Sequence, residues 1–173
     1  MKTALFAALV ATTATACSVD VQRERANGKD VDIRTPVGDL SVKTEITTDG
    51  IGLPAYPGAR PLTEDEEPSS ATVNISSSLF GVKVQAAKYA SDDAVDPIAA
   101  FYRRELERFG PVTECRGRDL EFRKGGTDGP QCGSRTARTE VQLGAGTDGD
   151  EHIVVVKPRG AGSELALVSV QTR

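Results

Sequence analysis

The sequence predicts an α+β domain, a mostly antiparallel β-sheet with one amphipathic helix packed on a face, preceded by a short hairpin-like N-terminal segment. Several short stretches alternate apolar and polar residues, which is typical of half-buried strands. One stretch, between residues 96 and 110, instead has apolar residues at helical spacing. The turns are short and Gly-rich, as in "GAGTDGD" and "PRGAGS", and short turns join antiparallel neighbours.

The first 16 residues have the order of a secretory signal peptide. Lys2 supplies a positive start, residues 4–11 are apolar, and small residues follow up to Ala16. The apolar run is much shorter than the roughly 20 residues that span a bilayer. We therefore expect residues 1–16 to be removed on export.

Cys17 follows this stretch directly. The sequence "TATAC" resembles the lipobox of bacterial lipoproteins, where small residues precede a cysteine that is lipidated and becomes the first mature residue. The resemblance implies a lipid on Cys17 and hence a membrane anchor. Ala14 departs from the lipobox, which has a large aliphatic residue there, and Ala14-Thr15-Ala16 also fits an ordinary signal peptidase. The alternative is a secreted or periplasmic protein without an anchor.

The other two cysteines, Cys115 and Cys132, lie close together in the sequence with a Gly-rich loop between them. In an exported protein they are the natural disulfide pair, and Cys17 is then the odd cysteine that a lipid would occupy. Two buried thiols are the alternative.

Composition narrows the function classes. The chain has 173 residues, enough for one ordinary domain plus a tail after the leader is removed, and a formal net charge of −4. A mildly acidic chain gives no reason to expect nucleic-acid binding. Aromatic residues make up 5% and tryptophan is absent, which argues against a surface for stacking bases or sugars.

Residues 17–52 are expected to form an N-terminal tether with short β segments. Alternating runs at 31–35 and 40–44 flank the turn signal Val37-Gly38-Asp39. The stretch "VDIRTPVGDLSVKT" resembles one unit of a short β-repeat of bacterial envelope proteins of unknown function. One hairpin is marginal alone, so the segment either packs on the main domain or remains a partly ordered tether.

The main domain is expected over residues 53–173, with strands at 72–76 and 82–86. A helix follows, with Asp96 as N-cap, Pro97 in the first position and Gly110-Pro111 as the stop. Beyond it we expect a strand at 112–115 and a long polar loop at 117–136. Three further strands are expected at 139–143, 153–156 and 165–170. The apolar stripe of the helix comprises Ile98, Phe101, Tyr102, Leu106 and Phe109.

The combination of "YPGAR", "AAKYASDD" and "FYRREL" resembles a family of small exported bacterial proteins and lipoproteins of unknown function. The resemblance covers roughly residues 53–173. It implies the same fold and export, and it supplies no catalytic residues.

No catalytic residue, metal or cofactor is expected. A single histidine, His152, excludes a metal site built on several histidines, and its position after a Gly/Asp-rich turn predicts a surface side chain at a hairpin end. A local basic cluster is a candidate for contact with anionic envelope polymers or lipid head groups, although interspersed acidic residues also fit a solvated loop. It comprises Arg116, Arg118, Arg123 and Lys124.

These features predict an exported, membrane-anchored envelope protein that acts as a non-enzymatic binding or structural module for an envelope protein or polymer. The alternative is a small secreted hydrolase with a carboxylate-based site. A deep polar cleft with two carboxyl groups of raised pKa would favour the hydrolase. A flat sheet face or an exposed apolar patch would favour the module.

Overall fold

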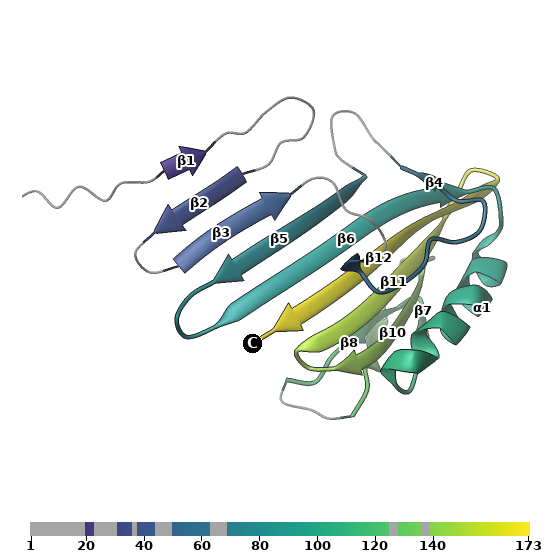
Figure 1. Cartoon of the computed structure of the whole chain (residues 1–173). Helices are drawn as coiled ribbons and strands as arrows, with labels where there is room; N and C mark the ends of the chain where they lie inside the picture. Colours follow the sequence, from purple (N-terminus) through teal and green to yellow (C-terminus); the bar gives the residue numbers. More distant parts are fainter. Residues whose placement is uncertain are drawn as a thin grey trace, which may run out of the picture.

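The computed structural model describes residues 20–22, 31–35, 38–43, 50–62, 69–124, 128–135 and 139–173. The predicted signal peptide and Cys17 lie outside these residues. The fold is the predicted α+β arrangement, one long antiparallel sheet with a single α-helix packed on it (Figure 1).

The strands of the long sheet are all antiparallel to their neighbours. From one edge to the other they are β1 (Asp20–Gln22), β2 (Val31–Thr35), β3 (Gly38–Lys43), β5 (Ser70–Ser76), β6 (Gly81–Ser91), β12 (Gly162–Thr172), β11 (Asp150–Arg159), β10 (Val141–Thr147) and β7 (Thr113–Arg116). The short β4 (Arg60–Pro61) also pairs with β6. A separate two-stranded sheet contains β8 (Arg118–Glu121) and β9 (Gln131–Arg135).

The N-terminal hairpin is continuous with the main sheet. β2 pairs with β3, and β3 pairs with β5, with Leu40 opposite Ile75. Of the two arrangements that the sequence left open, the described residues show the hairpin joined to the sheet.

The helix α1 (Val95–Leu106) continues into the 3-10 turn η2 (Glu107–Phe109). Its N-cap is Ala94, which has no side chain able to cap, so the predicted capping role of Asp96 is wrong. Asp96 lies in the first turn, where a negative charge favours the helix dipole. Gly110 ends the turn with a φ of 127°, a conformation that glycine adopts without strain.

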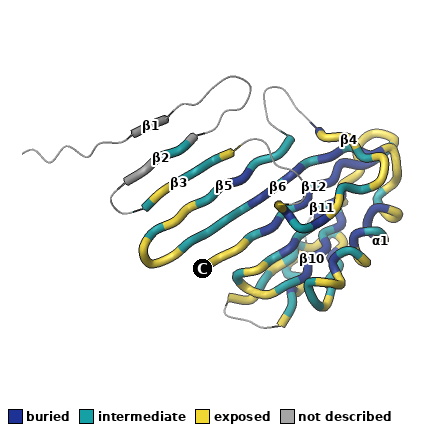
Figure 2. The backbone as a smooth tube through the Cα atoms, in the orientation of Figure 1, coloured by how far each residue is buried: buried dark blue, intermediate teal, exposed yellow. Residues whose placement is uncertain are grey.

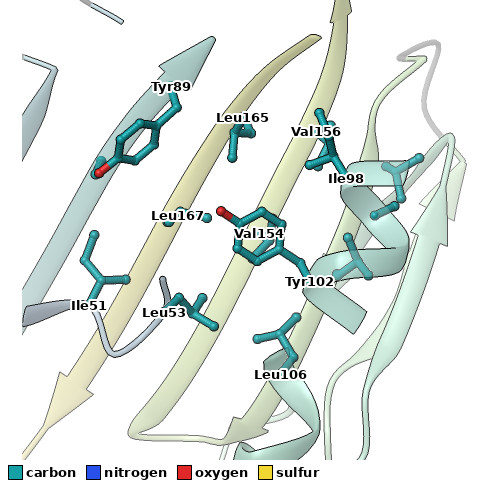
Figure 3. Packing of buried hydrophobic residues seen from close by; sticks show 14 of the residues in the cluster. Ile51, Leu53, Tyr89, Ile98, Tyr102, Leu106, Val154, Val156, Leu165 and Leu167 are labelled. Atoms are coloured by element: carbon teal, nitrogen blue, oxygen red, sulfur yellow. The ribbon is translucent and has the colours of Figure 1, made fainter. Parts of the chain in front are cut away.

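The hydrophobic core lies between α1 and one face of the sheet (Figure 3). Tyr102, the largest of its fully buried side chains, donates a hydrogen bond of 3.0 Å to the Pro54 carbonyl. This bond ties the segment before β4 over the core. Phe101, predicted in the same stripe, is only half-buried and packs edge-on against Tyr56. Burial is concentrated around α1 and the strands beneath it (Figure 2). Other fully buried core side chains are Ile98, Leu106, Leu143, Val154, Val156, Leu165 and Leu167.

The segment predicted as a loop at 117–136 contains β8 and β9, so that prediction was wrong. The hairpin packs on the side of the sheet opposite α1, because Gly144 leaves room for it. A Cβ added at Gly144 would lie 2.4 Å from Leu120 Cδ2. The Leu120 amide also donates to Gln142 Oε1 at 2.9 Å, and the disulfide Cys115–Cys132 fixes β9 to β7.

Candidate functional site

The side of the sheet that faces away from α1 is apolar across several neighbouring strands. On β6 the core residues Ala87 and Tyr89 face the helix, so the even-numbered residues face the other way. Directly paired residues of antiparallel strands lie on the same face, and the register therefore aligns apolar side chains in rows. We call this surface the open face; it comprises Ile33, Leu40, Val42, Val73, Ile75, Val82, Val84, Ile153, Val155, Val168 and Val170.

The opposite side of the same strands is polar where it extends beyond the helix. Ser41, Asn74, Lys83 and Gln171 form one continuous row across β3, β5, β6 and β12. The outer strands are thus amphipathic, with their polar side on the same side of the sheet as α1 and their apolar side facing away from it. Alternating strands of this kind normally bury the apolar side.

In the described part of the chain, nothing covers the open face over β2, β3, β5 and β6. The elements that pack on this side are β8 and β9, and their contacts are with β7 and β10 at the other edge of the sheet. The side chains of the open face are accordingly partly exposed, and Ile75 is 42% exposed. A contiguous exposed apolar surface of this kind is typical of an interaction site.

The turn between β5 and β6 adds two exposed apolar side chains at the end of this surface. Leu79 is 91% exposed and Phe80 is 53% exposed. The turn is fixed by Ser77, whose Oγ accepts hydrogen bonds from the amides of Leu79 at 3.2 Å and Phe80 at 3.1 Å. The Ser77 amide also donates to the Phe80 carbonyl at 2.8 Å. We call residues 77–80 the hairpin tip; its apolar side chains are held outward by an ordered backbone.

A shallow apolar groove connects the hairpin tip with the open face. Its volume is about 270 Å³. Ile33 and Leu40 line it from the N-terminal hairpin, Ile75 and Phe80 from the β5–β6 hairpin, and Asp39 lies at its border. Open face and hairpin tip therefore form one continuous surface.

His152 was predicted at the surface, but the structure buries it, with 4% of its area exposed. It lies on the core side of β11, where its ring stacks on Phe109 with 3.6 Å between centroids. Gly52 lies against both rings, since an added Cβ would be 3.5 Å from Phe109 and 3.7 Å from His152. Burial lowers the pKa of His152, although Asp150, 3.5 Å from Nε2, acts in the opposite direction. An enclosed imidazole of this kind supports the core and has no open approach for a substrate.

The hydrolase alternative requires two carboxyl groups in a polar cleft, and the groove beside the hairpin tip has one, Asp39, among its lining residues. Burial, together with the charge of Asp148, raises the pKa of Glu151. Burial also acts to raise the pKa of Glu114, but Arg103 and Arg116 outweigh it and lower that pKa. The described residues also contain no group of three side chains suited to hold a metal ion.

The basic cluster predicted from the sequence is divided in the structure. Arg116 forms ion pairs with Asp96 at 2.8 Å and Glu114 at 2.7 Å. Arg118 donates through Nε to the Gly133 carbonyl at 3.1 Å. These two guanidinium groups already have protein partners, which weakens the case for an anion site. The remaining members, Arg123 and Lys124, are exposed after the end of β8.

The predicted Cys115–Cys132 disulfide is present. Disulfides are typical of proteins outside the reducing cytosol. Among the described residues, no helix has the length and apolar character needed to cross a membrane. The candidate lipidation site Cys17 precedes the first described residue, Asp20.

Comparisons with protein-family models, with curated proteins and with solved structures gave no match. Function is therefore inferred from the residues and their geometry. The open face and the hairpin tip are the surfaces that sequence reasoning missed. Two features of the sequence could have indicated these surfaces. They are the alternation of apolar and polar residues at 40–44, 72–76 and 82–86, and the apolar pair in "SSSLFG".

Proposed function

We propose that this chain is an exported, non-enzymatic binding module of the bacterial cell envelope. A lipid on Cys17 anchors it to a membrane, and the open face is its binding surface. The observation that carries the proposal is the open face itself, an aligned apolar surface that the described residues leave uncovered. The leader-like N-terminus, the lipobox-like "TATAC" and the disulfide support export.

The chemistry of the open face also narrows the class of partner. Over β3, β5 and β6 its central rows consist of Val, Ile and Leu side chains, which gain free energy from removal of water and offer no hydrogen bonds. These rows end at Thr172 on β12 and Glu151 on β11. A charged or heavily hydroxylated envelope polymer would lose hydration there without compensation. An apolar partner, whether protein or lipid, fits this surface better than a polymer does.

The anchor is tested by labelling cells with a clickable fatty acid. The wild-type protein should carry the label, and Cys17→Ser should lose it and leave the membrane fraction. Ser18→Ala, which changes the neighbouring residue, is the control and should behave as wild type. An unlabelled wild-type protein would show that an ordinary signal peptidase releases a soluble product instead.

The binding surface is tested by photo-crosslinking in cells. A crosslinker at Val84, in the middle of the open face, should trap a partner. The control position, Arg104, is exposed on the outer side of α1. Equal crosslinking from both positions, or from neither, would contradict a binding role for the open face.

A further inference from the structure

The first residue of β1, Asp20, and the hairpin tip lie at the same end of the sheet. In the register of the sheet, Asp20 is opposite Arg34, Arg34 is opposite Asp39, and Asp39 is opposite Ser76. Ser76 is the last residue of β5 and immediately precedes the hairpin tip. Figure 1 shows β5 ending and β6 beginning at this end of the sheet, close to the C-terminus.

The chain between Cys17 and the sheet is short. Three residue steps separate Cys17 from Asp20, and an extended chain covers at most about 10 Å in that length. From β1 to β5 there are three ladder steps, which amount to roughly 14 Å across the sheet. A lipid on Cys17 would therefore hold this end of the sheet, and the hairpin tip with it, close to the membrane surface.

The two ends of the sheet differ in chemistry. At the anchor end, Leu79 and Phe80 are exposed and continue into the apolar groove. At the opposite end, Arg60 and Asp92 form an exposed ion pair of 2.9 Å, and Lys157 pairs with Glu164 at 3.0 Å. The end where the anchor would emerge thus carries two exposed apolar side chains beside the charged residues Asp39 and Arg173, whereas ion pairs mark the end that would point away.

From this arrangement we infer that the hairpin tip and the adjoining groove insert into the surface of the lipid bilayer that carries the Cys17 anchor. The inference rests on the proposed anchor, and it names the bilayer as the occupant of this end of the open face. Attachment at two points, the lipid and the tip, fixes the orientation of the sheet relative to the membrane. The end with the Arg60–Asp92 ion pair and the helix side then face the aqueous space.

A single tryptophan tests the inference, because the chain contains none. The lipidated Phe80→Trp protein is reconstituted in neutral phosphatidylcholine vesicles that contain a bilayer-depth quencher. We expect its emission to shift to the blue and to be quenched by the lipid. Ala161→Trp, in the exposed β11–β12 turn at the opposite end, is the matched control and should show neither effect. Equal quenching at both positions, or at neither, would overturn the inference.

A second measurement separates the tip from the anchor. In exported Cys17→Ser protein, which carries no lipid, Leu79→Ser with Phe80→Ser should reduce vesicle binding roughly tenfold or more. Phe80→Leu in the same background keeps the tip apolar and should bind nearly as the parent does. Equal vesicle binding of all three proteins would overturn the inference.

The outcomes for anchor and tip are distinguishable. If the wild-type protein is acylated on Cys17 while Phe80→Trp remains unquenched, the anchor stands and the inference fails. If the wild-type protein is not acylated on Cys17 and Phe80→Trp is still quenched by vesicles, the tip contact stands and the anchor fails. A blue shift that depends on protein concentration and not on lipid would show that the tip contacts a second copy of the chain. That result would overturn the inference.

Discussion

Reducing the Cys115–Cys132 disulfide should destabilise the protein by about 3 kcal/mol. The two cysteines are 17 residues apart, and the chain-entropy model gives about 3 kcal/mol for closing a loop of that size. The bridge attaches β9 to β7, so it also holds the β8–β9 hairpin where Leu120 packs over Gly144. Reduction leaves every side chain in place except the bond itself, which makes it a cleaner perturbation than substitution of the fully buried Cys115.

The measurement is urea unfolding of the oxidised and the reduced wild-type protein, followed by far-UV circular dichroism. The reduced protein should have the lower free energy of unfolding and a larger m value, because its unfolded chain exposes more surface. The double variant Cys115→Ala and Cys132→Ala should be insensitive to reductant and serves as the control. Coinciding free energies for the two wild-type forms would refute the view that the bridge constrains the unfolded chain.

Two further predictions concern packing and backbone, and both are measured as shifts of the unfolding free energy. Tyr102→Phe removes a buried hydrogen bond and should lower the unfolding free energy by about 1 kcal/mol. Tyr102→Ala should lower it by about 3–5 kcal/mol, clearly more than Phe101→Ala, whose ring is half-buried. Equal losses for the two alanine variants would contradict the central position of Tyr102 in the core. Gly146→Ala should destabilise the protein by roughly 1–3 kcal/mol, because the φ of Gly146 is 103° and an added Cβ would lie 2.1 Å from the Asp150 carbonyl oxygen. The control is Gly81→Ala, where the atoms nearest to an added Cβ are 3.9 Å away, and its unfolding free energy should stay close to that of the wild type.

Local sequence patterns were sufficient to predict the helices and strands whose apolar residues recur with a clear period. The helix and the strands around 72–76, 82–86, 153–156 and 165–170 follow from spacing alone, since 3.6-residue and two-residue periods differ clearly. The β8–β9 hairpin was missed because "RDLE" and "QCGSR" are polar and Gly-containing, and their pairing is supported by contacts with distant residues. Leu120 against Gly144 and the disulfide supply that support.

The open face shows what a strand pattern leaves undecided. Alternation identifies which residues share a side of a strand, and it does so correctly for Val73 and Ile75. It does not identify which side α1 covers. The helix packs on β10 and β11, so the strands at the other edge of the sheet extend past it with their apolar side facing away. That arrangement is a property of the assembled sheet and of no single segment.

His152 shows the same limit for a single residue, and it leads to a pH dependence of stability. Its neighbours in sequence are polar, but Phe109 and Gly52 come from distant segments and enclose the ring. Burial lowers the pKa of the imidazole, and the charge of Arg108 acts in the same direction, while Asp150 opposes both. The folded state therefore favours neutral His152, whereas the unfolded chain binds a proton near the ordinary pKa of about 6.5.

The stability contributed by neutral His152 should be fully present above about pH 6.5 and should be lost as the pH falls from there toward the lower folded pKa. For one proton the slope cannot exceed about 1.4 kcal/mol per pH unit. His152→Gln cannot titrate, so the difference between wild-type and variant unfolding free energies, measured from pH 5 to pH 8, isolates this proton. Glu151, whose raised pKa is due first to burial and acts with the opposite sign, titrates in both proteins and cancels in the difference. A difference that stays constant below pH 6.5 would mean that folding leaves the imidazole as accessible to protons as in the unfolded chain, contrary to its enclosure by Phe109 and Gly52.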